Sequence, residues 1–303
     1  MLKKEMFQSL TGETLEQFTW APDGAIAGVI QIVHGMAEHI ARYNDAAEAL
    51  NHASFAVVGH THAGHGEGAP VKGFFGVRGG LDAMIGDVHA LRLRVTAEHP
   101  GTPYFLLGHS MGSFLARLYI EQYAEGLSGV VLSGTGHYPK AVAGFGLLLS
   151  RLAILAGQGK KPSVFIARVM SAGNLKHIEN AKTPFDWLSA DEACVAKYNA
   201  DPLCGFPFTA YGYRDLFHAL MRLTDMKRMA AIPKDLPVYL FSGLEDPVGG
   251  YGSAVGLVAA ELRRAGVLDV DTRLYKGGRH EMLNEVNAAE VYGDLASWLY
   301  KHL

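Results

Sequence analysis

The chain has 303 residues, which is enough for one large domain or for a domain with an insertion. Its net charge is −3 (27 basic minus 30 acidic residues) and it has no basic run, so nothing favours nucleic acid as a partner and none is expected. Its two cysteines are too few for a disulfide framework. Charged residues make up only 19% of the chain, less than the roughly 25% of an average soluble domain, and this shortfall predicts some exposed apolar surface.

No targeting segment is expected at the start of the chain, because residues 1–7 lack the apolar core of a signal peptide. The most apolar long window, 141–157, is interrupted by two glycines, Ser150 and Arg151, and is expected to fall short of a membrane span. Together with the small number of cysteines, these features favour a soluble, cytoplasmic protein.

The first expected element is an antiparallel hairpin over 6–20, with its turn at 11–13. Apolar strand-like runs then alternate with segments of helical spacing. The expected strands are 29–33, 55–58, 104–107, 130–132, 238–241 and 270–274. The expected helices are 41–52, 81–99, a segment ending near Tyr123, 253–265 and 288–303. Such alternation is typical of a mostly parallel central sheet with helices on both faces, so the predicted fold class is α/β.

The alternation stops between about 136 and 233, where apolar windows of helical spacing occur without a convincing strand. These windows are 145–155, 164–170 and 216–229. We expect a helical cap over 137–232, inserted into a core formed by 1–136 and 233–303. Because the cap follows a strand beside the middle of the sheet, it should cover the carboxyl ends of the strands, where ligands bind in such folds.

The strongest chemical signal is Gly108-His109-Ser110-Met111-Gly112, which lies between an apolar strand-like run and a segment of helical spacing. In that context Gly-x-Ser-x-Gly predicts a nucleophile elbow. The turn is so tight that the two glycines are needed for close backbone approach. It lifts the Ser110 hydroxyl clear of the sheet, and the following helix N-terminus provides N–H groups for a developing anion.

A serine nucleophile needs a base and a carboxylate that orients the base, and after an elbow these follow in the order Asp or Glu, then His. Glu245 and Asp246 lie side by side just beyond one expected strand, and His280 lies in a glycine-rich loop beyond the next. The predicted triad is therefore Ser110 as nucleophile, Asp246 as orienting carboxylate and His280 as base.

An oxyanion hole also needs two backbone N–H donors. Met36, which follows Gly35 at a strand exit, and Met111, which follows the serine, are the expected donors. His34 and His109 are expected to hold loops in place and to take no part in the chemistry.

Five motifs in combination resemble the monoacylglycerol lipase and lysophospholipase group of α/β-hydrolases, which is serine aminopeptidase-like. They are HGMAEH at 34–39 with Arg42-Tyr43, HAGHG at 62–66, GHSMG at 108–112, SGLEDPV at 242–248 and GRHE at 278–281. The similarity covers nearly the whole chain, including the cap segments 184–189 and 201–206. It implies an α/β-hydrolase fold with the same triad and oxyanion residues, and no metal or organic cofactor.

The chain departs from the group's usual pattern in the loop around His65. Thr61 stands where Asp is common, Ala63 where Arg is frequent and Gly68 where Ser is common. The triad does not depend on these positions, but the anchoring of the loop near the pocket is expected to differ.

A zinc site is the rival interpretation of this loop, because His60, His62 and His65 have a spacing that metal ligands use. Gly64 stands where the corresponding metal motif has Asp, and no second ligand cluster follows. We therefore expect no metal, and we expect these histidines to form hydrogen bonds within the loop.

The sequence predicts a serine carboxylic-ester hydrolase acting on a small-molecule ester or a monoacyl lipid, as a monoacylglycerol lipase or lysophospholipase does. Two alternatives stay open: a serine aminopeptidase of the proline iminopeptidase type, which needs an acidic cluster in the cap, and a non-catalytic binding protein. Phe145, Leu148 and Leu152 in the cap are the expected substrate-binding residues. Ordinary helix packing and a transient, peripheral contact of the cap with a membrane surface are the other roles open to these apolar windows.

Overall fold

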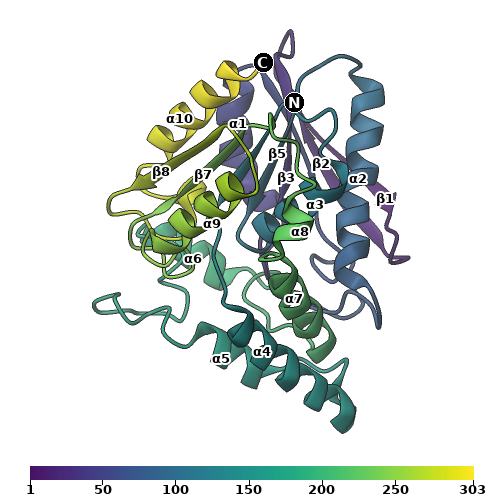
Figure 1. Cartoon of the computed structure of the whole chain (residues 1–303), viewed down its shortest axis with the longest axis vertical. Coiled ribbons are helices and arrows are strands. Elements are labelled where there is room, and N and C mark those ends of the chain that lie inside the picture. Colours follow the sequence, from purple (N-terminus) through teal and green to yellow (C-terminus); the bar gives the residue numbers. More distant parts are fainter.

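The computed structural model describes all 303 residues, as a central eight-stranded sheet with helices on both faces and a helical layer at one end (Figure 1). The sheet order is β1-β2-β4-β3-β5-β6-β7-β8. Neighbours from β4 to β8 are parallel, whereas β2 is antiparallel to both β1 and β4. The strands are β1 (Leu2–Gln8), β2 (Thr14–Trp20), β3 (Gly28–Val33), β4 (Phe55–His60), β5 (Tyr104–His109), β6 (Gly129–Ser133), β7 (Val238–Gly243) and β8 (Val270–Tyr275).

The central strands are continuous apolar runs because both faces of the sheet are covered. Every residue of β3, β4, β5, β6 and β7 is buried. Successive side chains point to opposite faces, so Leu106 packs into one hydrophobic core while Phe105 and Leu107 pack into the other. The strands extend one or two residues further than their apolar runs predict, as at His60 and His109, and these polar ends lie at the edge of the sheet that faces the cap.

Helices cover both faces of the sheet as the sequence predicts. One core joins the sheet to α1 (Asn44–His52) and α10 (Ala288–Lys301), and the other joins it to α2 (Gly80–Glu98), α3 (Met111–Tyr123) and α9 (Ser253–Arg264). The expected helix over 41–52 begins as a separate 3-10 turn, η1 (Ile40–Tyr43). That turn carries Arg42.

Between β6 and β7 the chain forms only helices, and we use the name cap for residues 137–232. Its helices are α4 (Lys140–Ala153), which continues as the wider turn η2 (Ile154–Gln158), α5 (Val164–Ser171), α6 (Glu192–Ala200), α7 (Ala210–Arg222) and α8 (Met226–Met229). In Figure 1 the cap helices α4 and α5 lie at the end of the molecule opposite the two termini.

Two features of the cap differ from the sequence prediction. Helix α6 was not expected, because Val195 and Tyr198 are its only large apolar residues, and these two are the ones that the structure buries. The single window expected over 216–229 is two helices, since Asp225 caps α8 by accepting the N–H of Lys227.

The segment Lys140–Gln158 corrects a further expectation. It is long and apolar enough, by length and composition only, to cross a membrane, although the sequence prediction placed it short of that limit. Only 22% of its most apolar window is buried inside the protein, so most of this apolar surface faces outward. The outer face of the cap is therefore largely apolar along this helix.

Candidate active site

The turn from β5 into α3 holds Ser110 in a strained conformation, with φ 52° and ψ −119°. A β carbon added to Gly108 would lie 2.4 Å from the carbonyl oxygen of Gly112, and one added to Gly112 would lie 1.9 Å from that of Val33. Neither position therefore admits a side chain. Backbone strain of this kind persists only where the surrounding structure enforces it, and it is typical of functional sites.

Asp246 and His280 meet at the exits of β7 and β8. Oδ1 of Asp246 is 3.0 Å from Nδ1 of His280, and both residues are completely or almost completely buried. The carboxylate also accepts the Ser242 hydroxyl at 2.6 Å and the Val248 N–H at 2.8 Å. These bonds fix the carboxylate, which in turn fixes the plane of the imidazole ring.

The electrostatics of the pair favour an ionised acid beside a basic imidazole. Burial alone would raise the pKa of Asp246, but the His280 ring and the donors just named hold that pKa below its ordinary value. Burial would likewise lower the pKa of His280, whereas the negative charges of Asp246, Glu281 and Glu38 raise it above its ordinary value. The Nε2 atom of His280 is buried and has no hydrogen-bond partner, so it is free to accept a proton.

Glu245, the other carboxylate in the Glu245-Asp246 pair, does not contact the histidine. Its side chain is 52% exposed, and its nearest cation is Nε of Arg279 at 4.0 Å. The structure thus separates two neighbouring carboxylates into one buried against His280 and one at the surface.

Met36 and Met111, the expected oxyanion donors, line the same cavity as Ser110. The Met36 N–H lies in the turn after β3 and donates no hydrogen bond within the protein. Met111 is the first residue of α3, where an N–H has no partner inside the helix. Gly35 allows the turn after β3 to approach the turn that holds Ser110, because a β carbon at residue 35 would lie 3.2 Å from Cβ of Ser110.

Ser110 and His280 open into a cavity of about 480 Å³ between the sheet edge and the cap. Sixteen of its 29 lining residues are hydrophobic, as expected for a site that binds an apolar ligand. The cap contributes the hydrophobic residues Tyr138, Val164, Ala167, Met170, Phe185, Trp187, Leu188, Tyr198, Phe206, Tyr213 and Leu216.

The three cap residues expected to bind substrate do not line this cavity. Phe145, Leu148 and Leu152 lie on the outer side of α4, where they are 57%, 52% and 53% exposed. Helical spacing identified an apolar stripe correctly but could not say which way it faces. The inner wall comes instead from α5 and α7 and from the loops around α6.

The remaining histidines near the site are engaged in loop contacts. Nε2 of His34 accepts the His62 N–H at 2.9 Å, Nε2 of His65 accepts the Ala37 N–H at 3.3 Å, and Nδ1 of His109 is 3.1 Å from the Ser133 hydroxyl. Burial lowers the pKa of His65 and of His109 to about 4, so both rings are neutral at ordinary pH.

One group of side chains has the chemistry of a metal site. The ligand atoms of His39, Asp201 and Cys204 lie within 4.8 Å of one another. Nε2 of His39 already bonds Oδ2 of Asp201 at 2.8 Å, and the Arg42 guanidinium acts electrostatically on Cys204. A neighbouring cation and an existing hydrogen bond both oppose metal binding, so we assign no metal to this group.

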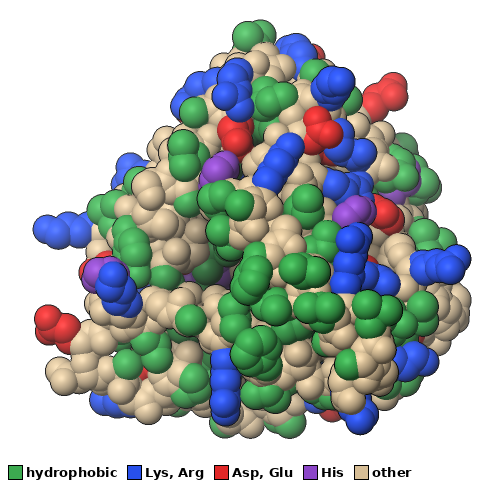
Figure 2. Space-filling model, turned by 60° about the horizontal axis from the view of Figure 1, so that its bottom comes forward, with side chains coloured by type: hydrophobic (Ala, Val, Ile, Leu, Met, Phe, Trp, Pro, Cys, Tyr) green, Lys and Arg blue, Asp and Glu red, His purple; other side chains and the backbone are tan.

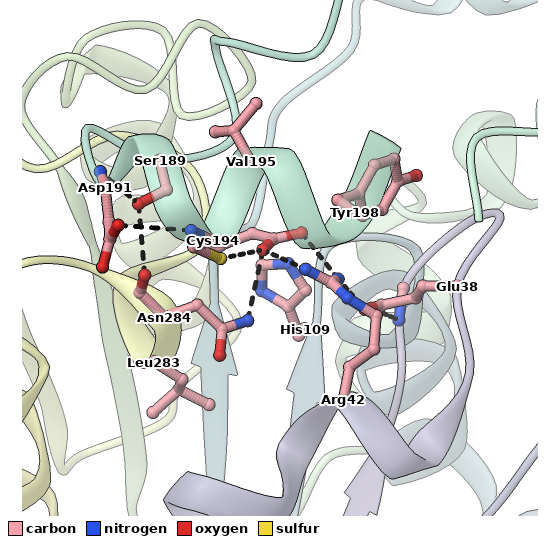
Figure 3. Close-up of polar contacts among 12 residues, drawn as sticks. Glu38, Arg42, His109, Ser189, Asp191, Cys194, Val195, Tyr198, Leu283 and Asn284 are labelled. Atoms are coloured by element: carbon pink, nitrogen blue, oxygen red, sulfur yellow. Dashed lines mark hydrogen bonds and ion pairs between the residues drawn. The ribbon is translucent and has the colours of Figure 1, made fainter. Parts of the chain in front are cut away.

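Three polar residues beside the site escaped the sequence analysis. Glu38 and Glu281 line the cavity, and Arg42 forms ion pairs with both (Figure 3). Their signal was present in the motifs HGMAEH with Arg42-Tyr43 and GRHE, which contain these three charged residues.

Comparison with known proteins agrees with this geometry. Residues 24–287 match the family model described as serine aminopeptidase, S33. The chain is 29% identical over 303 residues to the monoacylglycerol lipase of Mycolicibacterium smegmatis, with 98% of this chain and 96% of that protein covered. It is 27% identical over 284 residues to the monoglyceride lipase of Mus musculus, covering 92% of this chain and 84% of that protein.

A solved structure of a carboxyl esterase is also similar to this chain. The thermostable carboxyl esterase from Bacillus coagulans, in complex with glycerol, superposes with a TM-score of 0.92 at 32% identity, and the match covers 99% of this chain and 98% of that chain. The parallel sheet, the elbow and the inserted helices define an α/β-hydrolase, as predicted. The chain belongs to the serine aminopeptidase, S33 family, and it is an enzyme of the serine hydrolase class.

Proposed function

We propose that this enzyme hydrolyses carboxylic esters of monoacyl lipids through a Ser110–His280–Asp246 triad, as a monoacylglycerol lipase or lysophospholipase. The observation that carries the proposal is the hydrogen bond between buried Asp246 and His280, because His280 lines the same cavity as Ser110. Ser110 attacks the ester carbonyl while His280 takes its proton. The developing oxyanion is stabilised by the N–H groups of Met36 and Met111. His280 then protonates the leaving alcohol, and water repeats the cycle on the acyl-enzyme.

The charges around the cavity favour an ester over an amino-terminal peptide. An aminopeptidase needs a free carboxylate to bind the substrate ammonium group. The only acidic residues that line the cavity are Glu38 and Glu281, and both are paired with Arg42. The apolar cap wall suits an acyl chain, and the names of the relatives, monoacylglycerol lipase and monoglyceride lipase, support the same substrate class.

The outer face of the cap supports transient contact with a lipid surface. Figure 2 shows hydrophobic side chains gathered on this face with lysine and arginine around them. Exposed apolar residues project from α4, η2 and α5: Val142, Phe145, Leu148, Leu152, Leu155, Val164, Phe165 and Val169. Residues 140–171 carry five basic residues and no acidic one. This combination is typical of helices that lie on an anionic membrane surface.

A substrate panel tests the proposed chemistry. Purified enzyme is assayed with p-nitrophenyl esters from acetate to long acyl chains, a monoacylglycerol, a lysophosphatidylcholine and an amino-acid p-nitroanilide. We expect kcat/KM to rise with acyl length and the monoacyl lipids to be cleaved. Faster cleavage of the anilide than of any ester would replace the proposal with an aminopeptidase, and a preference for acetate without lipid cleavage would replace it with a small-ester esterase.

A further inference from the structure

Arg42 lies between two buried carboxylates that belong to different loops of the active site (Figure 3). Its Nη1 atom is 2.5 Å from Oε2 of Glu38 and 2.8 Å from Oε1 of Glu281, and its Nη2 atom is 2.6 Å from Oε2 of Glu281. The three side chains are only 11%, 3% and 4% exposed, in the order Arg42, Glu38 and Glu281. Forked, charge-assisted bonds of this kind fix orientation as well as charge.

Each carboxylate is attached to a part of the proposed catalytic machinery. Oε1 of Glu38 accepts the N–H of Gly35 at 2.5 Å and the hydroxyl of Tyr43 at 2.8 Å, so it fixes the turn that presents Met36. Glu281 directly follows His280, so its position sets that of the histidine loop. Arg42 therefore joins the turn after β3 to the histidine loop, and it lies 239 positions before Glu281 in the sequence.

The unexpected cap helix α6 packs onto the same group. The Tyr198 ring lies over the Arg42 guanidinium at 4.7 Å, and its hydroxyl donates to the Ala37 carbonyl at 3.0 Å. Cys194, one turn earlier on α6, directs its thiol to Glu281 at 3.9 Å. Both side chains are labelled in Figure 3, above Arg42 and Glu38. The cap thus covers the ion-pair group and shields it from water.

We propose that Arg42 is a positioning residue of the hydrolase, which locks the oxyanion turn against the histidine loop and offsets one of the two negative charges that Glu38 and Glu281 place near His280. The inference rests on the proposed function, because it assigns Arg42 a role through Met36 and His280. Arg42 itself does not line the cavity and touches no substrate.

The arrangement has an electrostatic consequence that a purely structural ion pair would not have. Three sets of titratable groups face His280. They are Asp246 at the exit of β7, Glu281 and Glu38 of the ion-pair group, and His109, whose ring centre is 4.9 Å from that of His280. Arg42 also faces Cys204 from the cap. Glu281→Gln removes one negative charge near His280 and leaves Glu38 paired with Arg42. The imidazolium form of His280 is then less stabilised and the pKa of His280 falls, so the acidic limb of the kcat/KM profile should move to lower pH.

Two variants in the full-length protein test the proposal, with p-nitrophenyl acetate as substrate. Arg42→Ala should lower kcat by about 10²-fold, because loss of alignment of this size is expected when reacting groups shift by about 1 Å. Its KM should change little, since Arg42 does not contact the substrate. A cavity of about 390 Å³ lies beside Arg42, so added guanidinium chloride at low millimolar concentration can reach the vacated site and should restore part of the activity.

Controls separate this role from general stability. Arg273→Ala removes an exposed ion pair with Glu290, in which both side chains are about half exposed, and should leave kcat, pH profile and guanidinium response unchanged. The positioning role is overturned if Arg42→Ala folds and keeps the wild-type kcat. It is also overturned if the kcat of Arg42→Ala is lowered and added guanidinium does not raise it. If Arg42→Ala does not fold, Glu281→Gln decides: a shift of the acidic limb to lower pH supports the proposal, and an unmoved limb contradicts it. Failure of the proposed function itself is separate, because it would appear as esterase activity in Ser110→Ala.

Discussion

Gly112 approaches the carbonyl oxygen of Val33 so closely that a β carbon on the glycine would lie 1.9 Å from that oxygen. The helix that follows the elbow is thereby packed against the end of β3, and this contact brings Ser110 next to the turn that carries Met36. In Gly112→Ala the new methyl group would press against backbone atoms of β3, and no flexible side chain is there to move aside.

We expect Gly112→Ala to destabilise the protein by at least about 3 kcal/mol, the upper range for overpacked cores, and to abolish activity. Urea unfolding and ester hydrolysis measure the two effects. Gly256→Ala in α9 is the matched control, because nothing lies within 4 Å of its added β carbon. It should be neutral or stabilise the helix by up to about 1 kcal/mol. Equal unfolding midpoints for the two variants would disprove the close-packing argument.

The second prediction separates the adjacent carboxylates. Asp246→Asn should lower kcat by about 10⁴-fold, because an amide in that place favours the wrong imidazole tautomer. Glu245→Gln should stay within a few-fold of wild type, since the Glu245 side chain is 52% exposed and does not contact His280. Steady-state kinetics on both variants check the assignment, and the reverse ranking would transfer the orienting role to Glu245.

The third prediction concerns pH. In the proposed mechanism His280 must be neutral to accept the serine proton. Its pKa is raised above the ordinary value of 6.5 by Asp246 and the nearby glutamates, against the effect of burial. Activity should therefore be complete above this raised pKa and be lost as the pH falls through it. In kcat/KM profiles the acidic midpoint should lie above 6.5 in the wild type. The midpoint should move to lower pH in the residual activity of Asp246→Asn. A wild-type midpoint below about 6, which is lower than the pKa of free histidine, would contradict the account.

The fourth prediction uses the two sides of the cap. Met170 lines the cavity, so Met170→Asp should weaken the gain of about 0.8 kcal/mol per methylene that an acyl chain obtains from an apolar wall. The slope of kcat/KM against acyl length should flatten, while acetate esters stay good substrates.

Leu152→Asp is the control on the opposite side, because Leu152 is 53% exposed and lies outside the cavity. Its acyl-length slope on soluble esters should equal that of wild type, and its binding to vesicles containing phosphatidylglycerol should fall. Vesicle sedimentation and ester kinetics measure the two properties separately. A flattened slope in Leu152→Asp would return the substrate-binding role to the outer face.

Sequence patterns predicted the core well because buried parallel strands must be apolar on both sides. The run 104–107 and the Gly-x-Ser-x-Gly after it located both the central strand β5 and the strained turn that holds Ser110. Local chemistry was equally informative at Asp246 and His280, since each follows a strand whose exit lies at the same edge of the sheet.

What could not be predicted depends on contacts between distant segments. The stripe of Phe145, Leu148 and Leu152 has the spacing of a core helix, but spacing does not reveal whether a protein wall or solvent lies opposite. Helix α6 has few large apolar residues, and the signal that could have found it was the capping residue Asp191. The bridge from Arg42 to Glu281 spans 239 positions, a distance at which pattern reasoning has no information.

The most direct test of the account is labelling with a fluorophosphonate probe followed by peptide mass spectrometry. We predict that the wild-type protein is labelled at Ser110 alone, and that Ser110→Ala is unlabelled, folds normally and loses about six orders of magnitude in esterase turnover. Labelling at another residue, or substantial esterase activity in pure Ser110→Ala, would contradict the central claim that Ser110 is the nucleophile.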